Sequence, residues 1–524
     1  MVYIPRFLAG FASSYLFSQV PDQEVLRQAP DSITKSIAIV GAGSAGLGML
    51  QTLLALPDSV KEGWEFTLFE EREDVGGVWL PDNRPASPPD VPESPLYPQL
   101  HTNTPVPFMT YPGFPFPPGT PLYPSHPHIK AYHERFAHHY QLFDFIRFNH
   151  RVDVASWVGT SEKGYWNLTV SDGSGIVTQK KFAHLVVASG NHHLPRIPTW
   201  KGQEEWLKSS SKEGSRRIIR HSVYYRHPEA YANQTVVFIG YGSSSRDIAS
   251  QVLEFANKAS TSKLKPQLGD PLKGVTYKPD LSHFTADGLV FTDGTIVDAD
   301  TVILATGYLR QKPFLEKGGV LRADPSAKTN ISSQGRLTTN LVYIFPLYQH
   351  ILSLSDSYPT NALAFIGLPT IIANCPSDVA QSLLAAYAIT QPHILASREK
   401  LLDELAAYED RIRANGLDPY SNGHAMLGID DSNDYQDDLV KLLHDKGVYS
   451  SDRFVETWRR DMRDYLYLKK GWQRIEELGI GYEWTKDAET EEDWAHVMYK
   501  VNEWQRKWEE ENGIVFQPDL DFYH

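Results

Sequence analysis

The sequence predicts an α/β protein in which a large parallel-sheet domain is interrupted by a smaller one and followed by a helical extension. Three patterns lead to this fold class. Two apolar runs, Ile37–Val40 and Val236–Ile239, end in glycine-rich turns that open helices. Two further apolar runs, Leu185–Ala188 and Thr301–Ala305, end in small-residue turns. Beyond residue 396 the apolar residues recur at helical spacing.

The first glycine-rich turn has the features of a Rossmann-like dinucleotide-binding site. Gly41 allows a tight turn after the strand, Gly43 lets the backbone approach a diphosphate, and Gly46 lets the next helix pack closely. The helix N-terminus offers free N–H groups to the phosphates. The following strand ends in Glu70, an acid suited to ribose hydroxyls and unfavourable for a 2′-phosphate. This site therefore suits FAD or NAD better than NADP.

A second turn of the same kind begins at Gly240 and Gly242, with Ser245 in the third glycine position. Two dinucleotides on one chain are the minimum equipment for moving a hydride between them. Residues 259–270 are polar and interrupted by a proline, so no second strand is expected here. A 2′-phosphate needs a nearby cation. The candidates are Arg246, Lys263 and Lys265.

Length and composition narrow the function classes further. At 524 residues the chain is too long for one compact core, and its net charge of −14 argues against nucleic acid or an anionic membrane as partner. The only cysteine, Cys375, excludes a disulfide framework and a Cys-x-x-Cys redox pair, and its apolar context is typical of a small buried residue. No apolar run is long enough for a membrane span, and we expect a cytoplasmic protein.

Several short motifs surround the glycine turns. Gly76-Gly77-Val78-Trp79 follows Glu70 within ten residues. The proline-rich segment from Pro81 to Pro127 is expected to form a rigid loop over the first site. Its centre reads Leu100-His101-Thr102-Asn103-Thr104-Pro105, followed by Phe114-Pro115-Phe116-Pro117. The turns after the later strands read Ala188-Ser189-Gly190 and Ala305-Thr306-Gly307-Tyr308. Five histidines between His126 and His139 lack the spacing and partners of a zinc site, so no metal is expected.

In this order, from about Ile37 to Ile389, the motifs resemble the flavin-containing monooxygenase family (class B flavoprotein monooxygenases). The resemblance implies a large FAD domain interrupted by a smaller NADPH domain. It also implies that reduced flavin forms a C4a-hydroperoxide, which transfers one oxygen atom to a small organic substrate. In the family the residue matching Asn103 lies against the flavin and the nicotinamide, which makes Asn103 the candidate catalytic residue.

The same resemblance implies the two sets of cofactor contacts. For FAD they are Gly41, Gly43, Ser44, Ala45, Gly46, Glu70, Arg72, Gly77, Val78, Trp79, Thr102, Asn103, Val152, Ser189, Gly190, Thr306 and Gly307. For NADPH they are Tyr225, Gly240, Gly242, Ser243, Ser244, Ser245, Arg246 and Ala305.

The type of oxygenation is indicated by Tyr225-Arg226. Baeyer–Villiger relatives have Trp-Pro or Trp-Asp at these positions, whereas relatives that oxygenate nitrogen or sulfur have Tyr or Phe first. A soft nucleophile, an amine nitrogen or sulfur, is therefore the expected oxygen acceptor. His221, just before this pair, is expected to be structural. Three alternatives stay open: a Baeyer–Villiger enzyme, an FAD oxidase or dehydrogenase with a degenerate NADPH site, and a non-enzymatic flavin-binding scaffold. A homodimer is also compatible with the sequence.

These arguments divide the chain into five segments. They are an N-terminal arm (1–33, with a signal peptide as the alternative), the FAD domain (34–205 and 300–395), the NADPH domain (206–299) and a helical extension (396–524). Within the extension, helices are expected to start at Ser397, at Ser451 and at Thr490, the last with Asp493 in a capping box.

Overall fold

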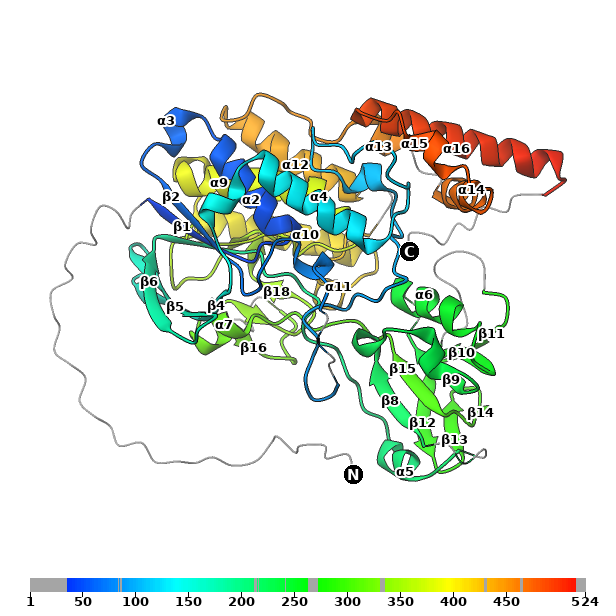
Figure 1. Ribbon diagram of the computed structural model, residues 1–524. Coiled ribbons are helices and arrows are strands. Elements are labelled where there is room, and N and C mark those ends of the chain that lie inside the picture. Colours follow the sequence, from blue (N-terminus) through cyan, green and yellow to red (C-terminus); the bar gives the residue numbers. More distant parts are fainter. Residues whose placement is uncertain are drawn as a thin grey trace, which may run out of the picture.

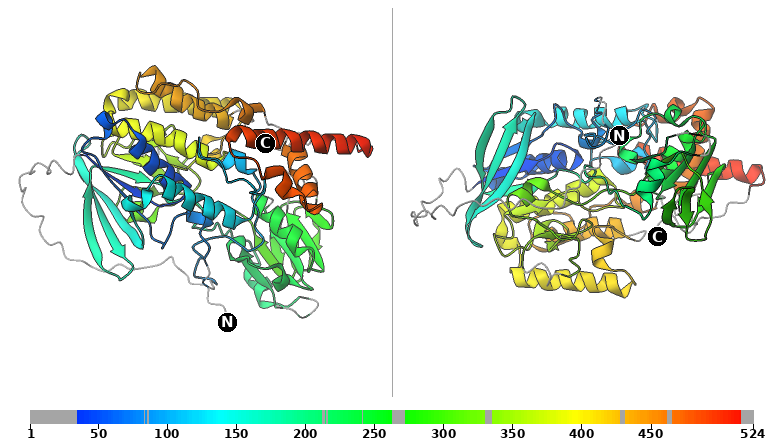
Figure 2. Two further views of the ribbon diagram at one scale, coloured as in Figure 1. Left: turned by 45° about the horizontal axis from the view of Figure 1, so that its top comes forward. Right: turned by 90° about the horizontal axis from the view of Figure 1, so that it is seen from below.

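The computed structural model describes residues 35–514 apart from 83, 85–86, 212–213, 215, 241, 263–271, 330–334, 428–430 and 462–464. The expected N-terminal arm, 1–33, therefore lies outside the described residues. Two parallel sheets form the centres of two bodies, which lie side by side (Figure 1). The smaller body, in green, sits below the C-terminal helices when the molecule is tilted forward (Figure 2). The predicted α/β fold class is confirmed.

The larger body is built on a seven-stranded sheet of order β19-β20-β21-β7-β1-β2-β3. Its central strands β21, β7, β1 and β2 are parallel, and β1 is buried along its whole length. Helices α2 (Ser44–Ala55) and α9 (Asn374–Thr390) pack together beside it, with α4 (His126–His139) next to α2 (Figure 1). The strands are β1 (Ser36–Val40), β2 (Glu65–Phe69), β3 (Ile146–Arg147), β7 (His184–Val187), β19 (Leu347–Tyr348), β20 (Leu352–Ser353) and β21 (Leu363–Phe365).

A separate antiparallel sheet covers one end of this body (Figure 2). It consists of β4 (His150–Gly159), β5 (Gly164–Asp172) and β6 (Val177–Phe182), and α7 (Pro313–Lys317) packs on β4. Shorter elements complete the two bodies: α3 (Asp58–Lys61), α5 (Gln203–Lys208), β12 (Leu281–Thr285), β13 (Gly288–Phe291), β14 (Ile296–Val297), β16 (Arg322–Ala323), β17 (Thr338–Thr339) and β18 (Ile344–Phe345).

The smaller body contains a five-stranded parallel sheet of order β11-β10-β9-β15-β8, with α6 (Ser243–Val252) after β9. Its strands are β8 (Ile218–His221), β9 (Thr235–Ile239), β10 (Lys258–Ser262), β11 (Val275–Lys278) and β15 (Thr301–Leu304).

Two expectations about this sheet were wrong. A second strand was thought to be missing, but β10 is present between β9 and β11. Its small serine and threonine side chains are buried between the neighbouring strands, so a polar sequence forms an interior strand. The boundary at 299/300 is also wrong, because β15 lies between β9 and β8 in this sheet. All four of its residues are buried, as a central parallel strand requires.

The C-terminal extension is helical, as expected, and its helices pack on the larger body (Figure 1). Ser397 caps α10, and Thr490 with Asp493 forms the predicted capping box of α16. The helix expected from Ser451 is wrong: Asp437 Oδ1 accepts the N–H groups of Phe454 and Val455, and the helix begins only at Thr457. The helices are α10 (Arg398–Ala414), α11 (Pro419–Asn422), α12 (Asp431–Asp445), α13 (Thr457–Asp461), α14 (Tyr465–Glu477), α15 (Gly481–Thr485) and α16 (Glu491–Glu511). Over the part of the chain that the structure describes, no helix has the length and apolar character needed to cross a bilayer.

Candidate functional site

The first glycine turn leaves no room for side chains. Gly41 has φ +105°, and a Cβ there would lie 2.6 Å from the carbonyl oxygen of Ala188. A Cβ on Gly46 would lie 1.8 Å from the carbonyl oxygen of Gly41. Gly43 occupies the N-cap of α2 and brings no capping side chain. The first-turn N–H groups of α2 are thus left for an outside acceptor, as a diphosphate site requires.

Glu70 stands beside this turn at the end of β2. Its Oε2 accepts a hydrogen bond from the Ala42 N–H (2.6 Å), and its Oε1 accepts one from the Arg72 N–H (2.9 Å). Burial raises the pKa of this carboxyl group, and the two backbone donors oppose that shift. The structure therefore brings together the strand, turn, helix and acid that the sequence predicts. Binding of a ribose by Glu70 stays a prediction.

The Gly-Gly-x-Trp segment closes over the turn. Gly77 has φ +54°, and a Cβ there would lie 2.9 Å from the Cα of Gly43. Val78 and Trp79 complete a short 3₁₀ turn (Gly77–Trp79), and Trp79 is half-buried against the core. Two glycines from segments far apart in the sequence thus face each other across one narrow space.

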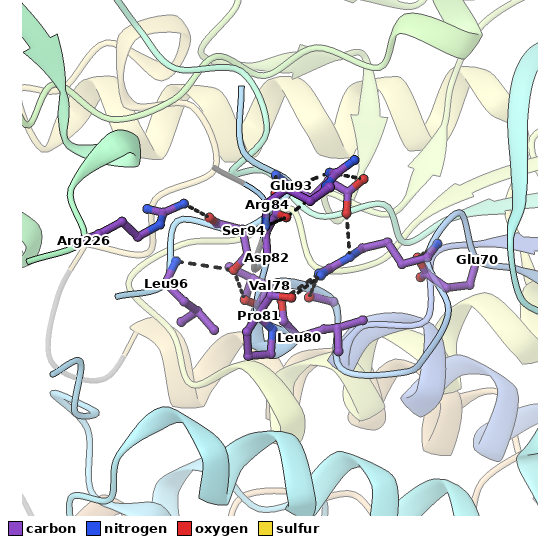
Figure 3. A network of polar contacts seen from close by, with 12 residues as sticks. Glu70, Val78, Leu80, Pro81, Asp82, Arg84, Glu93, Ser94, Leu96 and Arg226 are labelled. Atoms are coloured by element: carbon purple, nitrogen blue, oxygen red, sulfur yellow. Dashed lines mark hydrogen bonds and ion pairs between the residues drawn. The ribbon is translucent and has the colours of Figure 1, made fainter. Parts of the chain in front are cut away.

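A polar network supports this segment (Figure 3). The Arg72 guanidinium donates to the carbonyl oxygens of Gly77 (3.2 Å), Leu80 (2.7 Å) and Pro81 (2.7 Å). Its Nε lies 3.1 Å from a carboxylate oxygen of Glu93, which is in the proline-rich loop. Arg72, predicted as an FAD contact, therefore holds the closing segment in place, and its direct contact with FAD stays a prediction.

The same network reaches the smaller body. The Ser94 hydroxyl donates to the Val78 carbonyl oxygen (2.6 Å), while the Ser94 carbonyl oxygen accepts from Arg226 (3.2 Å; Figure 3). Tyr225 is almost fully buried, and its ring packs on Tyr97 of the loop at a centroid distance of 5.0 Å. The Tyr225 hydroxyl donates to Gln251 Oε1 (2.8 Å). Tyr225 thus joins loop and domain, and its predicted contact with NADPH stays a prediction.

Asn103 and the second glycine turn meet directly. The Asn103 Nδ2 donates to the Ser243 hydroxyl (3.1 Å), and Ser243 is the first residue of α6. Beside it, Thr102 is buried, and its hydroxyl has no hydrogen-bond partner among the described residues. The loop of the first domain is therefore anchored at the phosphate-binding end of the second.

The second turn repeats the geometry of the first with more space. Gly240 has φ +104°, and a Cβ there would lie 2.4 Å from the carbonyl oxygen of Ala305. Gly242 is the N-cap of α6, and a Cβ on it would meet no described atom within 4 Å. Ser244 is exposed, Ser245 is fully buried, and Arg246 is half-buried. Lys263 and Lys265, the other two candidate cations, lie outside the described residues.

The remaining predicted contacts divide between the two bodies. Ser189 and Gly190 follow β7 and abut Gly41, while Val152 is buried in β4. Thr306 and Gly307 follow β15 at the carboxyl edge of the second sheet, so their contact with FAD stays a prediction. His221 is structural, as expected. Its Nδ1 accepts from the Val223 N–H (3.1 Å), and its Nε2 lies 3.1 Å from the Gly307 carbonyl oxygen.

Sequence reasoning missed a buried acid beside the first turn. Asp378 of α9 is 2% exposed, and burial raises its pKa to about 7. The Ser44 hydroxyl is a hydrogen-bond partner of this carboxyl group, and a Cβ on Gly367 would lie 3.4 Å from its Oδ1. Its Oδ2 has no partner within the described chain. An acid inside the apolar stretch around Cys375, itself buried as predicted, is the signal that could have revealed it.

These features fit a dinucleotide at each turn. The glycine cradle, the uncapped α2 and α6, and the unpartnered oxygens of Thr102 and Asp378 all leave polar groups for a ligand with phosphates and hydroxyls.

Known proteins show the same arrangement. Residues 34–266 match the family described as flavin-binding monooxygenase-like. Senecionine N-oxygenase from Tyria jacobaeae is 32% identical over 350 residues, which cover 64% of this chain and 68% of that protein. The chain belongs to this family of flavin-containing monooxygenases. A second relative, flavin-containing monooxygenase FMO GS-OX-like 9 from Arabidopsis thaliana, is 27% identical over 496 residues, covering 85% of this chain and 97% of its own.

A solved structure extends the similarity to the whole fold. S-allyl-L-cysteine S-oxygenase from Allium sativum is 26% identical with a TM-score of 0.67, covering 90% of this chain and 98% of that one. The chain is therefore an oxidoreductase, a flavin monooxygenase of the type that oxygenates nitrogen or sulfur, and its cofactors are FAD and NADPH. Its substrates are dioxygen and a small organic molecule.

Proposed function

We propose that this monooxygenase uses NADPH to reduce bound FAD and then transfers one oxygen atom to an amine nitrogen or sulfur. The observation that carries the proposal is the Asn103–Ser243 hydrogen bond of 3.1 Å, which joins the loop over the first glycine turn to the start of α6 at the second. Two dinucleotides bound at these turns would have their reactive ends on either side of this contact. The printed activities of the relatives, an N-oxygenase and an S-oxygenase, support a soft nucleophile as acceptor.

We assign FAD to the first turn and NADPH to the second. The acid Glu70 closes the first turn, and a carboxylate there would repel a 2′-phosphate. The strand at the matching place in the second site, β10, ends in Ser262, whose hydroxyl accepts from the Gly240 N–H (3.3 Å). A serine imposes no such repulsion. The presence of β10 also weakens the alternative of an oxidase with a degenerate second site.

The bound cofactors supply the reducing equivalents and the activation of dioxygen. The chain's own residues bind, orient and shield them. The N-termini of α2 and α6 hold the two diphosphates. The proline-rich loop, held by Arg72 and by the Ser94–Arg226 contact, excludes water from the space below it. Asn103 offers an amide that donates and accepts at once, so it can orient the nicotinamide and an oxygen of the reacting group together.

The alternatives make different products. A Baeyer–Villiger enzyme inserts oxygen beside a ketone, and an oxidase releases only hydrogen peroxide. The position that suggests nitrogen or sulfur oxygenation, Tyr225, lies in the core against Tyr97, so it acts through the shape of the cleft. A cytoplasmic location and a homodimer stay predictions.

NADPH consumption measured together with product and peroxide tests the proposal. Purified protein should be yellow, and NADPH should bleach its flavin faster than NADH. With N,N-dimethylaniline or thioanisole, N-oxide or sulfoxide should accumulate at close to one per NADPH consumed. A colourless protein that gains no flavin spectrum with FAD would overturn the assignment. NADPH oxidation that yields only peroxide, whatever amine or sulfide is offered, would favour the oxidase.

A further inference from the structure

Two cations follow the return of the chain from the smaller body. Arg310 and Lys312 lie just beyond the linker, where the Leu309 N–H donates to the Leu194 carbonyl oxygen of the outgoing strand (2.8 Å). Lys312 is the N-cap of α7, and its Nζ donates to the carbonyl oxygen of Gly190 and lies 3.4 Å from Oδ1 of Asn191. The pair thus stands where the two bodies join.

This pair differs from the other buried cations in having no acid beside it. Each buried arginine of the described chain has a carboxylate oxygen close by: Arg72 with Glu93 (3.1 Å), Arg217 with Asp298 (2.5 Å) and Arg459 with Glu456 (2.6 Å). Lys312 is equally buried, yet no described carboxylate lies within 4 Å of it or of Arg310. The Arg310 Nη1 is shielded from solvent and has no hydrogen-bond partner among the described residues.

Two neighbouring cations without an anion are unstable in such a place. Burial lowers the pKa of Lys312 to about 7 and that of Arg310 to about 10, and the charge of Arg310 adds to the shift of Lys312. A charge removed from water is costly unless it is paired. The neutral oxygens of Gly190 and Asn191 compensate only in part, so the site is built for an anion that comes from outside the chain.

The pair is connected to the first dinucleotide site by short contacts. Asn191, beside the Lys312 ammonium, donates through Nδ2 to the Gly367 carbonyl oxygen (2.7 Å). A Cβ on Gly367 would lie 3.1 Å from the Cβ of Ala45, at the start of α2. Each diphosphate, however, already has an uncapped helix N-terminus of its own. The anion is therefore better supplied by the third molecule in the cleft.

We propose that Arg310 and Lys312 bind a carboxylate, sulfonate or sulfate group carried by the amine or sulfide that the enzyme oxygenates. This substrate class rests on the proposed function. It means that the substrate is an anion held at one end by the two cations while its nitrogen or sulfur faces the flavin.

Matched substrates test this assignment in the holoenzyme. 4-(Methylthio)phenylacetate and 4-(methylthio)phenylacetamide have the same sulfur and differ only in charge. Wild type should prefer the acid, by about tenfold or more in kcat/KM. Lys312→Met and Arg310→Met should each raise KM for the acid about tenfold to a hundredfold and leave the amide within about twofold. Lys317→Met, which removes an exposed lysine from the same helix, serves as the control.

A binding measurement keeps the result independent of turnover. 4-Methylphenylacetate cannot be oxygenated at sulfur, and its binding to oxidised holoenzyme can be followed by the flavin difference spectrum. Its Kd should rise at least tenfold in Lys312→Met, and Lys312→Arg should restore most of the affinity. If wild type binds the acid but oxygenates neither sulfide, the proposed function fails while the anion site stands.

Three results would overturn the proposal. An equal loss with acid and amide would show that the pair only supports the fold. Loss of FAD or weaker NADPH binding, with the acid still preferred, would assign the anion to a cofactor diphosphate. Failure of wild type to bind the carboxylate would remove the site. If Lys312→Met does not fold, the Arg310→Met and Lys312→Arg variants decide the question by the same measurements.

Discussion

The two glycine turns follow one plan, and they differ in how tightly the helix packs on its strand. A Cβ on Gly46 would lie 1.8 Å from the Gly41 carbonyl oxygen, whereas the matching position of the second turn holds the whole side chain of Ser245, fully buried. Helix α6 therefore cannot approach its turn as closely as α2 does. The first turn is also closed by Glu70, while Gly242 and Ser243 are exposed. A tight, covered cradle suits a permanently held FAD, and an open one suits an exchanging NADPH.

The largest effect is expected from exchanging these packing constraints. Gly46→Ala should abolish FAD binding and destabilise the fold by on the order of 3–5 kcal/mol, because its methyl group would overlap the Gly41 backbone. Ser245→Ala should leave FAD content unchanged and stability within about 1 kcal/mol, because the Ser245 hydroxyl has no described partner to lose. Flavin absorbance per chain and thermal unfolding measure both. A stable, yellow Gly46→Ala protein would show that the two turns are equally tolerant.

The buried acid at the first turn gives the next effect. The pKa of Asp378 is raised by burial from 3.8 to about 7. Between these values the unfolded chain has lost this proton while the folded chain keeps it, so stability falls as pH rises, and the loss is complete above about pH 7. Asp378→Asn removes this dependence. Its stability advantage over wild type in the FAD-free protein should grow by roughly 2–3 kcal/mol between about pH 5 and pH 8.

Urea unfolding at several pH values measures this difference. Asp287→Asn, which alters an exposed acid of the smaller body, should follow the wild-type profile. An advantage of Asp378→Asn that is constant over the whole range would show that Asp378 does not hold a proton in the folded protein.

Local patterns made one part of this architecture predictable. Both strand–turn–helix units and the Thr490–Asp493 cap are encoded within a few neighbouring residues, and all three were found where expected. The position of β15 between β9 and β8 was not predictable, because a short apolar strand does not specify its partners. Strand β10 was missed since its serines and threonines look like a loop until neighbours bury them.

The same reason hid the charged residues of the cleft. Asp378 and Lys312 are buried by segments distant in sequence, and nothing in their own neighbourhood shows this. By contrast, Asn103 stands in a motif with enough local detail to identify it.

The contact between the turns should matter to oxygen transfer more than to cofactor binding. Asn103→Ala should keep FAD and still be reduced by NADPH, but transfer of oxygen to substrate should fall by around a hundredfold, the scale for losing one preorganised donor. More hydrogen peroxide should appear per NADPH consumed. Ser243→Ala removes only the partner and should have a smaller effect in the same direction, with Ser244→Ala as the control. Wild-type coupling in Asn103→Ala would make Asn103 a loop-bracing residue.

The smallest effect concerns the choice of nicotinamide cofactor at the second turn. Arg246 lies in the first turn of α6, half-buried, on the side of the site that lacks an acid. If its guanidinium meets the 2′-phosphate, Arg246→Ala should raise KM for NADPH about tenfold, since a charge-assisted hydrogen bond is lost. KM for NADH should stay within about twofold, because NADH has no such phosphate. Lys258→Ala alters an exposed cation at the far end of β10 and should change neither value. Equal use of NADPH and NADH by wild type would show that the second turn reads only the diphosphate, which both share, and that its open shape carries no selection for the 2′-phosphate.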